Sequence, residues 1–205
     1  RGRVSIGMPS TTSAVIAGDL DRMIAEEYPE ICVYITDAGA GNVYEWLLDG
    51  RVDLAIIFSV PDSTDLVVKP LHDEEFWLVS HPRTALPGEI VDFADIFALP
   101  LVTSSRATTW RKVIDEVAGR FDKSIHPIIE TESVAALQSI LMSGQASAVL
   151  PKSYIDRQLH NSGLKCQPLV NPDLRGIVSL VHLSATPLGA AQKAVKNMLI
   201  TALRQ

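Results

Sequence analysis

The feature that most constrains this chain is an alternation of strands and helices that occurs twice, roughly 95 residues apart. Apolar runs typical of strands occur at 4–8, 31–36, 53–58, 100–105, 125–131 and 147–151. Between them, apolar residues at helical spacing predict helices from Ser13, over 42–50, over 108–121 and over 133–144. Strands and helices in this order form a mainly parallel sheet with helices on both faces. The sequence therefore predicts an α/β fold with two lobes of the same construction.

The segments outside the two repeats predict how the lobes are joined. Strands are expected at 66–71 and 76–81, and we interpret the acidic run at 73–75 between them as a solvated charge cluster beside a hinge. A late strand at 175–183 and a last helix from Thr186 remain after the second repeat. These leftover elements predict that the chain returns to the first lobe, which gives two crossings, a hinge and a cleft between the lobes.

Composition and charge narrow the classes of function. The chain has 205 residues, of which 47% are hydrophobic and 20% charged, as expected of a folded protein with a sizeable core. A net charge of −6 provides no basic face for nucleic acid or an anionic membrane. No apolar run approaches the about 18 residues of a membrane span. The opening "RGRVSIG" has no apolar signal-peptide core.

The two cysteines, Cys32 and Cys166, lie far apart in the sequence, each within a strand-like run. This pattern predicts buried free thiols in a reducing compartment, and a disulfide between them is the alternative.

Small polar residues follow the strands that lead into the predicted helices. The four strand-to-helix corners are Ser10–Ser13, 37–42 ("DAGAGN"), 103–109 ("TSSRATT") and 131–133 ("TES"). In open α/β sheets, ligands bind beyond the carboxyl ends of the strands, where helix N-termini favour anions. The corners therefore predict a site that holds a small carboxylate or similar anion without transforming it. The alternative is that these hydroxyls only cap the helices.

Two side chains beside the second-lobe corners have two interpretations each. Arg106 is the one cation that we place near the expected cleft, and it is either a clamp for a carboxylate or a solvated loop residue. Trp110 is either an apolar wall of the pocket or part of the core.

Motifs for metal binding, dinucleotide binding and nucleophilic catalysis do not occur in the sequence. The five histidines show no metal-ligand spacing, and no H-E-x-x-H, C-x-x-C or G-x-S-x-G is present. "GAGNVY" departs from G-x-G-x-x-G at Tyr44. Glu130 and Glu132 are the only carboxylates expected near the corners. We therefore expect no cofactor, no metal and no catalytic residues.

Several segments together resemble the C-terminal effector-binding domain of LysR-type transcriptional regulators. They are "RVSIG", "YPEICVYI", "GAGNVYEWLLDGRVDLAII", "VKPLHDEEFWLVSHP" and "LQSILMSGQASAVLP", in the family's order and over essentially the whole chain. The last segment carries Ala146 where the family usually has a second glycine. The resemblance implies the type II periplasmic-binding-protein fold, with lobe 1 formed by 1–75 and 176–205 and lobe 2 by 76–175. "NVYEWLLDGR" is most similar to the nitrogen-assimilation-control branch, in which effector dependence is not universal.

The resemblance also implies a site and partners. A small anionic metabolite, commonly a carboxylate, would bind between the lobes and modulate DNA binding by an N-terminal winged helix-turn-helix domain that this chain lacks. Carried over by position, and with Arg106 added as the cation, the effector contacts would be Ser10, Thr11, Gly39, Ala40, Gly41, Thr103, Ser104, Arg106, Thr108 and Ser133. Many relatives have a hydroxyl side chain at the position of Ala40, so this corner offers only backbone N–H groups.

Family members are cytoplasmic homodimers, often paired as tetramers. The resemblance implies that the first helix and second strand of lobe 1 pack on lobe 2 of the partner. Here this would use the exposed side of residues 18–35, around Leu20, Ile24 and Tyr34.

Two other classes of function remain open. A periplasmic solute-binding protein has the same fold, and a signal peptide in the full gene product would favour it. A small enzyme of this fold, such as a dehydratase acting on a carboxylate, would need an acid, a base or an activated nucleophile in the cleft.

Overall fold

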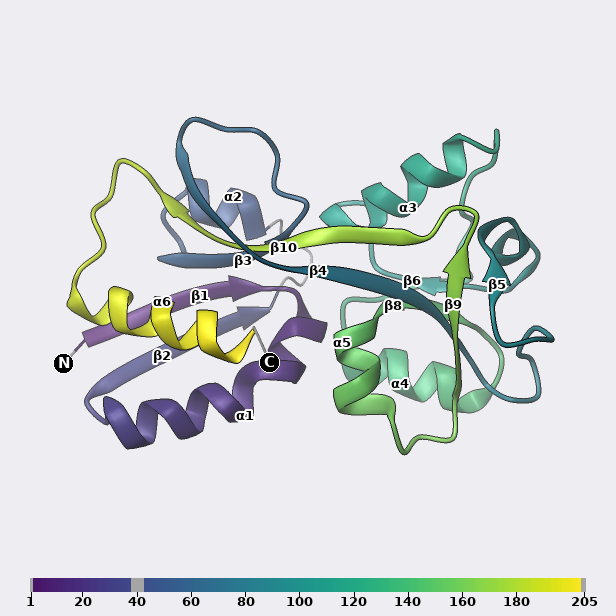
Figure 1. The fold of residues 1–205 in the computed structure, drawn as a ribbon, viewed down its shortest axis with the longest axis horizontal. Coiled ribbons are helices and arrows are strands. Elements are labelled where there is room, and N and C mark those ends of the chain that lie inside the picture. Colours follow the sequence, from purple (N-terminus) through teal and green to yellow (C-terminus); the bar gives the residue numbers. More distant parts are fainter. Residues whose placement is uncertain (1, 38–42, 204–205) are drawn as a thin grey trace. The chain divides into compact units, whose positions relative to one another are not determined.

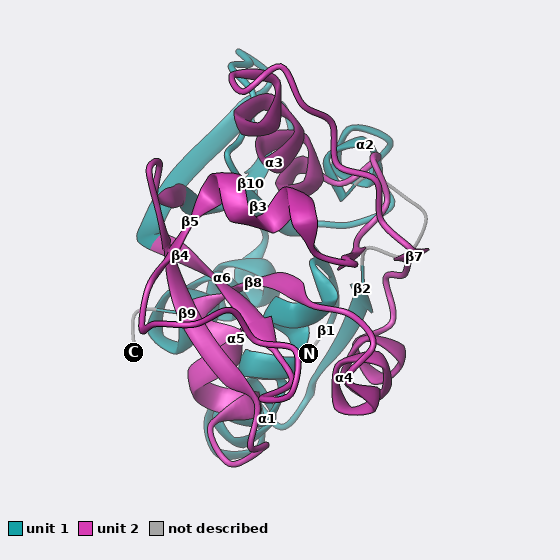
Figure 2. Ribbon diagram, turned by 90° about the vertical axis from the view of Figure 1, so that its right-hand side faces the viewer, with its two compact units in different colours: residues 1–73, 177–205 teal, residues 74–176 magenta. Residues whose placement is uncertain are grey.

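The computed structural model describes residues 2–37 and 43–203. The chain divides into two compact units, Arg1–Asp73 with Ile177–Gln205 as unit 1 and Glu74–Gly176 as unit 2 (Figure 2). The chain passes from one unit to the other twice, within two long strands, β4 (Leu66–Ser80) and β10 (Leu174–Leu183).

Unit 1 is a sheet covered by helices on both faces. Its elements are β1 (Gly2–Met8), α1 (Ser10–Glu27), β2 (Ile31–Asp37), α2 (Val43–Leu48), β3 (Leu54–Phe58), the first part of β4, the second part of β10, and α6 (Ala190–Ala202). The strand order is β2-β1-β3-β10, in which β1 is parallel to β2 and β3, and β10 is antiparallel to β3. All five residues of β3 are buried, as expected of a strand with neighbours on both sides and cover on both faces.

Two glycines of β1 show how closely the helices of unit 1 approach the sheet. A Cβ at Gly2 would meet Ala191 of α6 at 3.2 Å, and one at Gly7 would meet Val43 of α2 at 3.0 Å. Since successive residues of a strand point to opposite faces, α6 and α2 lie on opposite faces of the sheet. The helix α1 lies against α6, on the same face (Figure 1).

Unit 2 has the same succession of elements with shorter strands. It begins with the second part of β4 and ends with the first part of β10. Between them lie β5 (Val91–Asp92), the 3-10 helix η1 (Phe93–Ala98), β6 (Val102–Thr103), α3 (Thr109–Gly119), β7 (Ile129–Glu130), α4 (Val134–Ser143), β8 (Ala148–Pro151), α5 (Lys152–Tyr154), the π-helical turn η2 (Ile155–Leu159) and β9 (Lys165–Val170). β8 and β9 pair antiparallel with β4, β5 is parallel to β9, and β6 is parallel to β7.

Several predicted boundaries are wrong for identifiable reasons. The helix α1 begins at Ser10 rather than Ser13, because the carbonyl of Pro9 already accepts a hydrogen bond from Ser13 N at 3.0 Å. The helix α6 begins at Ala190 rather than Thr186, since Gly189 is its N-cap and its carbonyl accepts from Lys193 N. β6 and β7 cover two residues each.

The acidic run at 73–75 is solvated only in part, since Asp73 is exposed and Glu75 half-buried, whereas Glu74 is buried. The segments predicted as two strands form one continuous strand, β4. Within it Glu74 is only 6% exposed, and its carboxylate accepts hydrogen bonds from Ser153 N at 3.0 Å and from Ser153 Oγ at 2.6 Å. Glu74 therefore links β4 to α5 by hydrogen bonds within unit 2.

Four further residues test expectations from the sequence. Cys32 is exposed, so the prediction of a buried thiol is wrong there; Cys166 is half-buried, and burial raises the pKa of its thiol. Leu20 is 1% exposed and belongs to the core of unit 1, so it is not a surface contact. Positive φ angles among the described non-glycine residues occur only at Ser59, Asp122 and Asn171, so Ala146 replaces the family's glycine without a left-handed backbone.

No helix in the described part of the chain is both long enough and apolar enough to cross a membrane.

The aspartate of "GRVDLAII" has a structural role. The carboxylate of Asp53 accepts hydrogen bonds from Ser5 N and Ser5 Oγ, both at 2.7 Å, and from Gln192 Nε2 at 3.1 Å. Burial acts to raise the pKa of Asp53, but these hydrogen bonds outweigh it and lower the pKa below its ordinary value. Asp53 thereby joins β1, the start of β3 and the first turn of α6.

We expect Asp53→Ala to lower the free energy of unfolding at pH 7 by about 1.5–3 kcal/mol, the range for a hydrogen bond to a charged group. Because the folded pKa is below the ordinary value of 3.8, this stabilisation is complete well above that value and is lost as pH falls through the folded pKa. Urea unfolding at pH 7 and at acid pH measures both effects. Asp62→Ala, which removes an exposed carboxylate of the same unit, is the control. A deficit for Asp53→Ala that is the same at both pH values would contradict the assignment.

Candidate functional site

The start of α1 is a helix N-terminus whose hydroxyls are not its caps. Pro9 is the N-cap, with φ −60° and ψ 144°, and no side chain caps the helix. Ser10 and Thr11 are half-buried in the first turn, which contains no acidic residue. The first N–H groups of a helix have no partner within it and carry partial positive charge. This α1 corner, residues 9–13, can therefore donate hydrogen bonds to an anion from backbone and side chains.

The second predicted corner of this unit lies outside the described residues. Gly39, Ala40 and Gly41 belong to this segment, which follows β2 and precedes α2.

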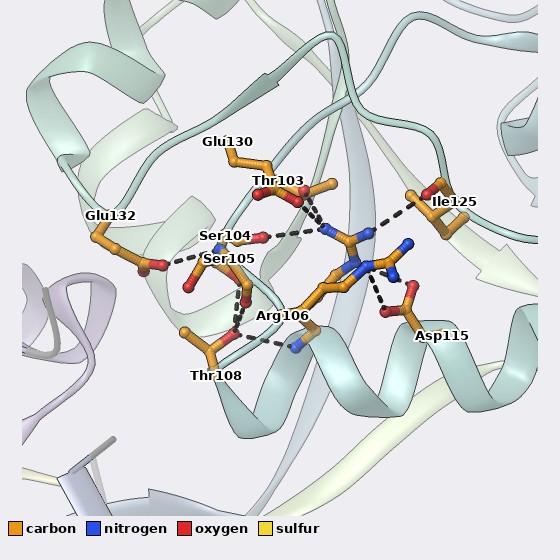
Figure 3. Close-up of polar contacts among 10 residues, drawn as sticks. Thr103, Ser104, Ser105, Arg106, Thr108, Asp115, Ile125, Glu130 and Glu132 are labelled. Carbon is orange, nitrogen blue, oxygen red and sulfur yellow. Dashed lines mark hydrogen bonds and ion pairs between the residues drawn. The ribbon is translucent and has the colours of Figure 1, made fainter. Parts of the chain in front are cut away.

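In unit 2 the structure brings the two predicted corners together. β6 and β7 are parallel neighbours, with Thr103 opposite Glu130, so the loops that follow them lie at the same end of the strands. Thr131 N donates to Thr103 O at 2.9 Å. Ser105 N donates to Glu132 Oε1 at 2.8 Å (Figure 3). We call residues 103–108 with 130–133 the unit 2 corner.

Two hydroxyls of the unit 2 corner are helix caps. Thr108 Oγ1 accepts from Arg111 N at 3.3 Å at the start of α3. Ser133 Oγ accepts from Ala136 N at 3.3 Å at the start of α4. The capping interpretation therefore accounts for Thr108 and Ser133, whereas it does not account for the hydroxyls of the α1 corner.

Ser104 and Thr108 also form a short chain of hydrogen bonds. Thr108 Oγ1 donates to Ser105 O at 3.0 Å and lies 2.8 Å from Ser104 Oγ. A threonine hydroxyl has one proton, so Thr108 cannot donate to both Ser104 Oγ and Ser105 O at once. Either hydroxyl of the pair can be the donor, and the contact links the loop after β6 to the cap of α3.

The main cation of the unit 2 corner is Arg111, which the sequence analysis missed. Its side chain is 0% exposed, and its guanidinium donates to Asp115 Oδ1 at 3.0 Å, Glu130 Oε1 at 2.9 Å and Thr103 Oγ1 at 2.8 Å. It also donates to the carbonyls of Ser104 and Ile125. Helical spacing could have predicted its burial, because Arg111 lies on the same buried face of α3 as Ile114 and Ala118.

Arg106, the predicted cation, lies at the surface. Its side chain is 70% exposed, and its Nε is 4.0 Å from Asp115 Oδ2. It is therefore a solvated partner of Asp115 in this structure, and Arg106 is not the one cation of the corner.

Trp110 packs inside unit 2. Its ring is stacked on that of Phe76 in β4, with a centroid distance of 3.2 Å and an interplanar angle of 12°. This contact supports the interpretation that one face of the Trp110 indole packs in the core.

The comparison with known families and curated relatives identifies the domain. The family model described as "LysR substrate binding domain" matches residues 1–204. The HTH-type transcriptional regulator BbuR of Bordetella bronchiseptica is 28% identical over 187 residues, which cover 89% of this chain and 56% of that protein. The nitrogen assimilation regulatory protein nac of Klebsiella aerogenes is 26% identical over 98% of this chain and 66% of its own length. The chain thus spans between about half and two thirds of these relatives.

Solved structures show the same fold at low identity. A full-length OxyR variant from Pseudomonas aeruginosa matches 99% of this chain and 69% of its own with a TM-score of 0.79 at 21% identity. The Synechocystis CcmR regulatory domain, in complex with 2-PG, matches 100% of this chain and 98% of its own with a TM-score of 0.79 at 17% identity. With a family model that matches nearly every residue, the chain belongs to the LysR substrate-binding domain family and has its type II periplasmic-binding-protein-like α/β fold.

Proposed function

We propose that this chain is the effector-sensing and dimerisation domain of a cytoplasmic LysR-type transcriptional regulator. The similar curated proteins are named as transcriptional regulators, which favours this function over solute transport or catalysis. The net charge of −6 disfavours DNA binding by this domain itself. DNA binding of the full-length protein would then come from a winged helix-turn-helix segment outside these 205 residues.

The proposed ligand is a small anionic metabolite, most simply a carboxylate, held between the two lobes. The observation that carries this proposal is the α1 corner, where hydroxyl residues form the first turn of a helix and no acidic residue lies in that turn. The proposed contacts remain Ser10, Thr11, Gly39, Ala40, Gly41, Thr103, Ser104, Arg106, Thr108 and Ser133.

A carboxylate effector should raise the melting temperature of the domain, because a ligand that binds only the folded state stabilises it by mass action. At a concentration about 100-fold above Kd the gain is about 2.7 kcal/mol. For a chain of this length, that corresponds to a rise of about 5–10 °C. A thermal-shift screen of metabolic mono- and dicarboxylates measures it. A screen without any shift would contradict the proposal and favour a family member that acts without an effector.

Thr11→Ala should weaken binding of the carboxylate found in that screen by about 10- to 150-fold, which corresponds to the loss of a hydrogen bond to a charged group. Because Thr11 is not the cap of α1, the melting temperature without ligand should change little. Thr201→Ala is the matched control, since it removes an exposed hydroxyl from another helix of unit 1. Isothermal titration of both variants gives the comparison, and unchanged affinity in Thr11→Ala would remove the α1 corner from the site.

Assembly as a homodimer, or as a tetramer of paired dimers, is part of the proposal. β2 is the edge strand of the unit 1 sheet and presents Tyr34, which is 50% exposed. The guanidinium of Arg3 lies 4.9 Å from the centre of its ring. Ile24 is half-buried, and Leu20 takes no part. An edge strand with an exposed aromatic side chain is a surface that pairs readily with a second chain.

Tyr34→Asp should therefore dissociate the dimer, because it places a charge on a desolvated contact. Light scattering at about 100 μM, where complexes with micromolar Kd are formed, should give a dimer for the wild type and a monomer for the variant. Ile90→Asp, which alters an apolar residue that is 59% exposed in unit 2, is the control and should remain dimeric. A monomeric wild type would contradict this assembly.

A further inference from the structure

Unit 2 contains a cavity that involves neither of its strand-to-helix corners. The cavity has a volume of about 330 Å³, at the lower end of the range of about 300–1,000 Å³ for sites that bind small molecules. Its walls come from the second part of β4, the end of β9, the turn that follows β9 and the start of β10, so every lining residue belongs to unit 2. None of them is among the proposed effector contacts.

One wall of the cavity is apolar. Glu75 and Trp77 are alternate residues of β4, so their side chains lie on the same face of the strand. Pro168 of β9 is the cross-strand partner of Trp77 and therefore lies on that face as well. Both Trp77 and Pro168 are half-buried. The indole and the proline ring together provide the kind of surface that binds the apolar body of a small ligand.

The other wall carries two ion pairs that share one cation. Arg175 Nη2 lies 2.9 Å from Glu75 Oε1, and Arg175 Nε lies 2.7 Å from Asp173 Oδ2. The indole Nε1 of Trp77 donates to Glu75 Oε2 at 3.1 Å, which joins this wall to the apolar one. Glu75, Asp173 and Arg175 are the charged residues of the lining, so the cavity has one net negative charge.

This charge favours a cation over an anion. An anion that reached Arg175 would lie close to Glu75 and Asp173, which contact the same guanidinium, and would be repelled by them. A carboxylate has about four lone-pair sites, and the contacts of Glu75 use one on each oxygen, so each oxygen can accept a further hydrogen bond. Lys152, which is not part of the lining, is paired with Asp156 and leaves the balance unchanged.

We propose that this cavity is a second small-molecule site, which binds an organic cation. The ammonium group of the ligand donates to Glu75, and its apolar body packs on Trp77 and Pro168. The proposal goes beyond the proposed function and does not depend on it, because the two sites share no residue. An occupant would contact both β4 and β10, the two strands within which the chain passes from one unit to the other.

The test uses phenethylammonium as the probe and phenylacetate, an aromatic compound of similar size and opposite charge, as the comparison. The indole N–H signal of Trp77 is followed by NMR and assigned with Trp77→Phe, because this group donates to Glu75. We expect a saturable shift with phenethylammonium and none with phenylacetate at the same concentration. Glu75→Gln should weaken binding of the probe by about 10- to 150-fold, the range for one charge-assisted hydrogen bond.

Glu116→Gln is the matched control, because it removes the same charge from an exposed position on α3 and should bind the probe as the wild type does. Equal weakening in Glu116→Gln would attribute the effect to net charge and overturn the proposal. A wild-type signal that phenylacetate shifts as strongly, or that neither compound shifts, also overturns it. Amide spectra verify that Glu75→Gln is folded. If it is not, Asp173→Asn at an exposed position replaces it, and unchanged affinity in that variant overturns the proposal.

Discussion

The organisation of unit 2 depends on one fully buried guanidinium. A cation removed from water is tolerated only where charged partners and hydrogen-bond acceptors surround it. Arg111 therefore requires acceptors from several parts of the chain, and it finds them on α3 itself, at the ends of β6 and β7 and in the loop at Ile125. These contacts hold the loop that follows β6 in place although β6 and β7 are only two residues long. A strand pair this short contributes few ladder hydrogen bonds, and the arginine supplies the missing constraint.

The two units share a succession of elements but differ in chemistry at their corners. In unit 1, the start of α1 carries hydroxyls and no acidic residue. The carboxylate of Asp53 accepts hydrogen bonds from Ser5 and Gln192. In unit 2, Arg111 pairs with Asp115 and Glu130, Glu132 accepts from Ser105 N, and the hydroxyls of Thr108 and Ser133 cap helices. Repetition of topology therefore does not imply repetition of binding chemistry.

The periodicity of the sequence predicted the elements whose identity depends on local pattern. The buried strand β3, the cap Ser133 of α4 and the left-handed Gly144 at its end follow from apolar runs and capping residues. The starts of α1 and α6 were wrong because hydroxyls and proline were interpreted as boundary signals, whereas backbone hydrogen bonds set the boundaries. Burial of Glu74 could not be predicted, since its partner Ser153 lies 79 residues away in the sequence. Of the partners of Arg111, Asp115 lies four residues away on the same helix, whereas Glu130 lies 19 residues away and meets it only through the pairing of β6 with β7. Gly39–Gly41 lie outside the described residues.

The discontinuity of unit 1 has a consequence for how the chain folds. The strand β10, which completes the unit 1 sheet, pairs Val178 with Phe58 of β3. Closing a flexible loop of about 120 residues has a larger entropic cost than forming the local β1–α1–β2 contacts, although the cost rises only logarithmically with length. Once unit 2 has formed, β10 is hydrogen-bonded beside β4, and the intervening chain is no longer flexible. Unit 2 can therefore fold before unit 1 is complete. The pairing of β10 with β3 then closes a much shorter flexible loop and adds the last strand to the β2-β1-β3 sheet.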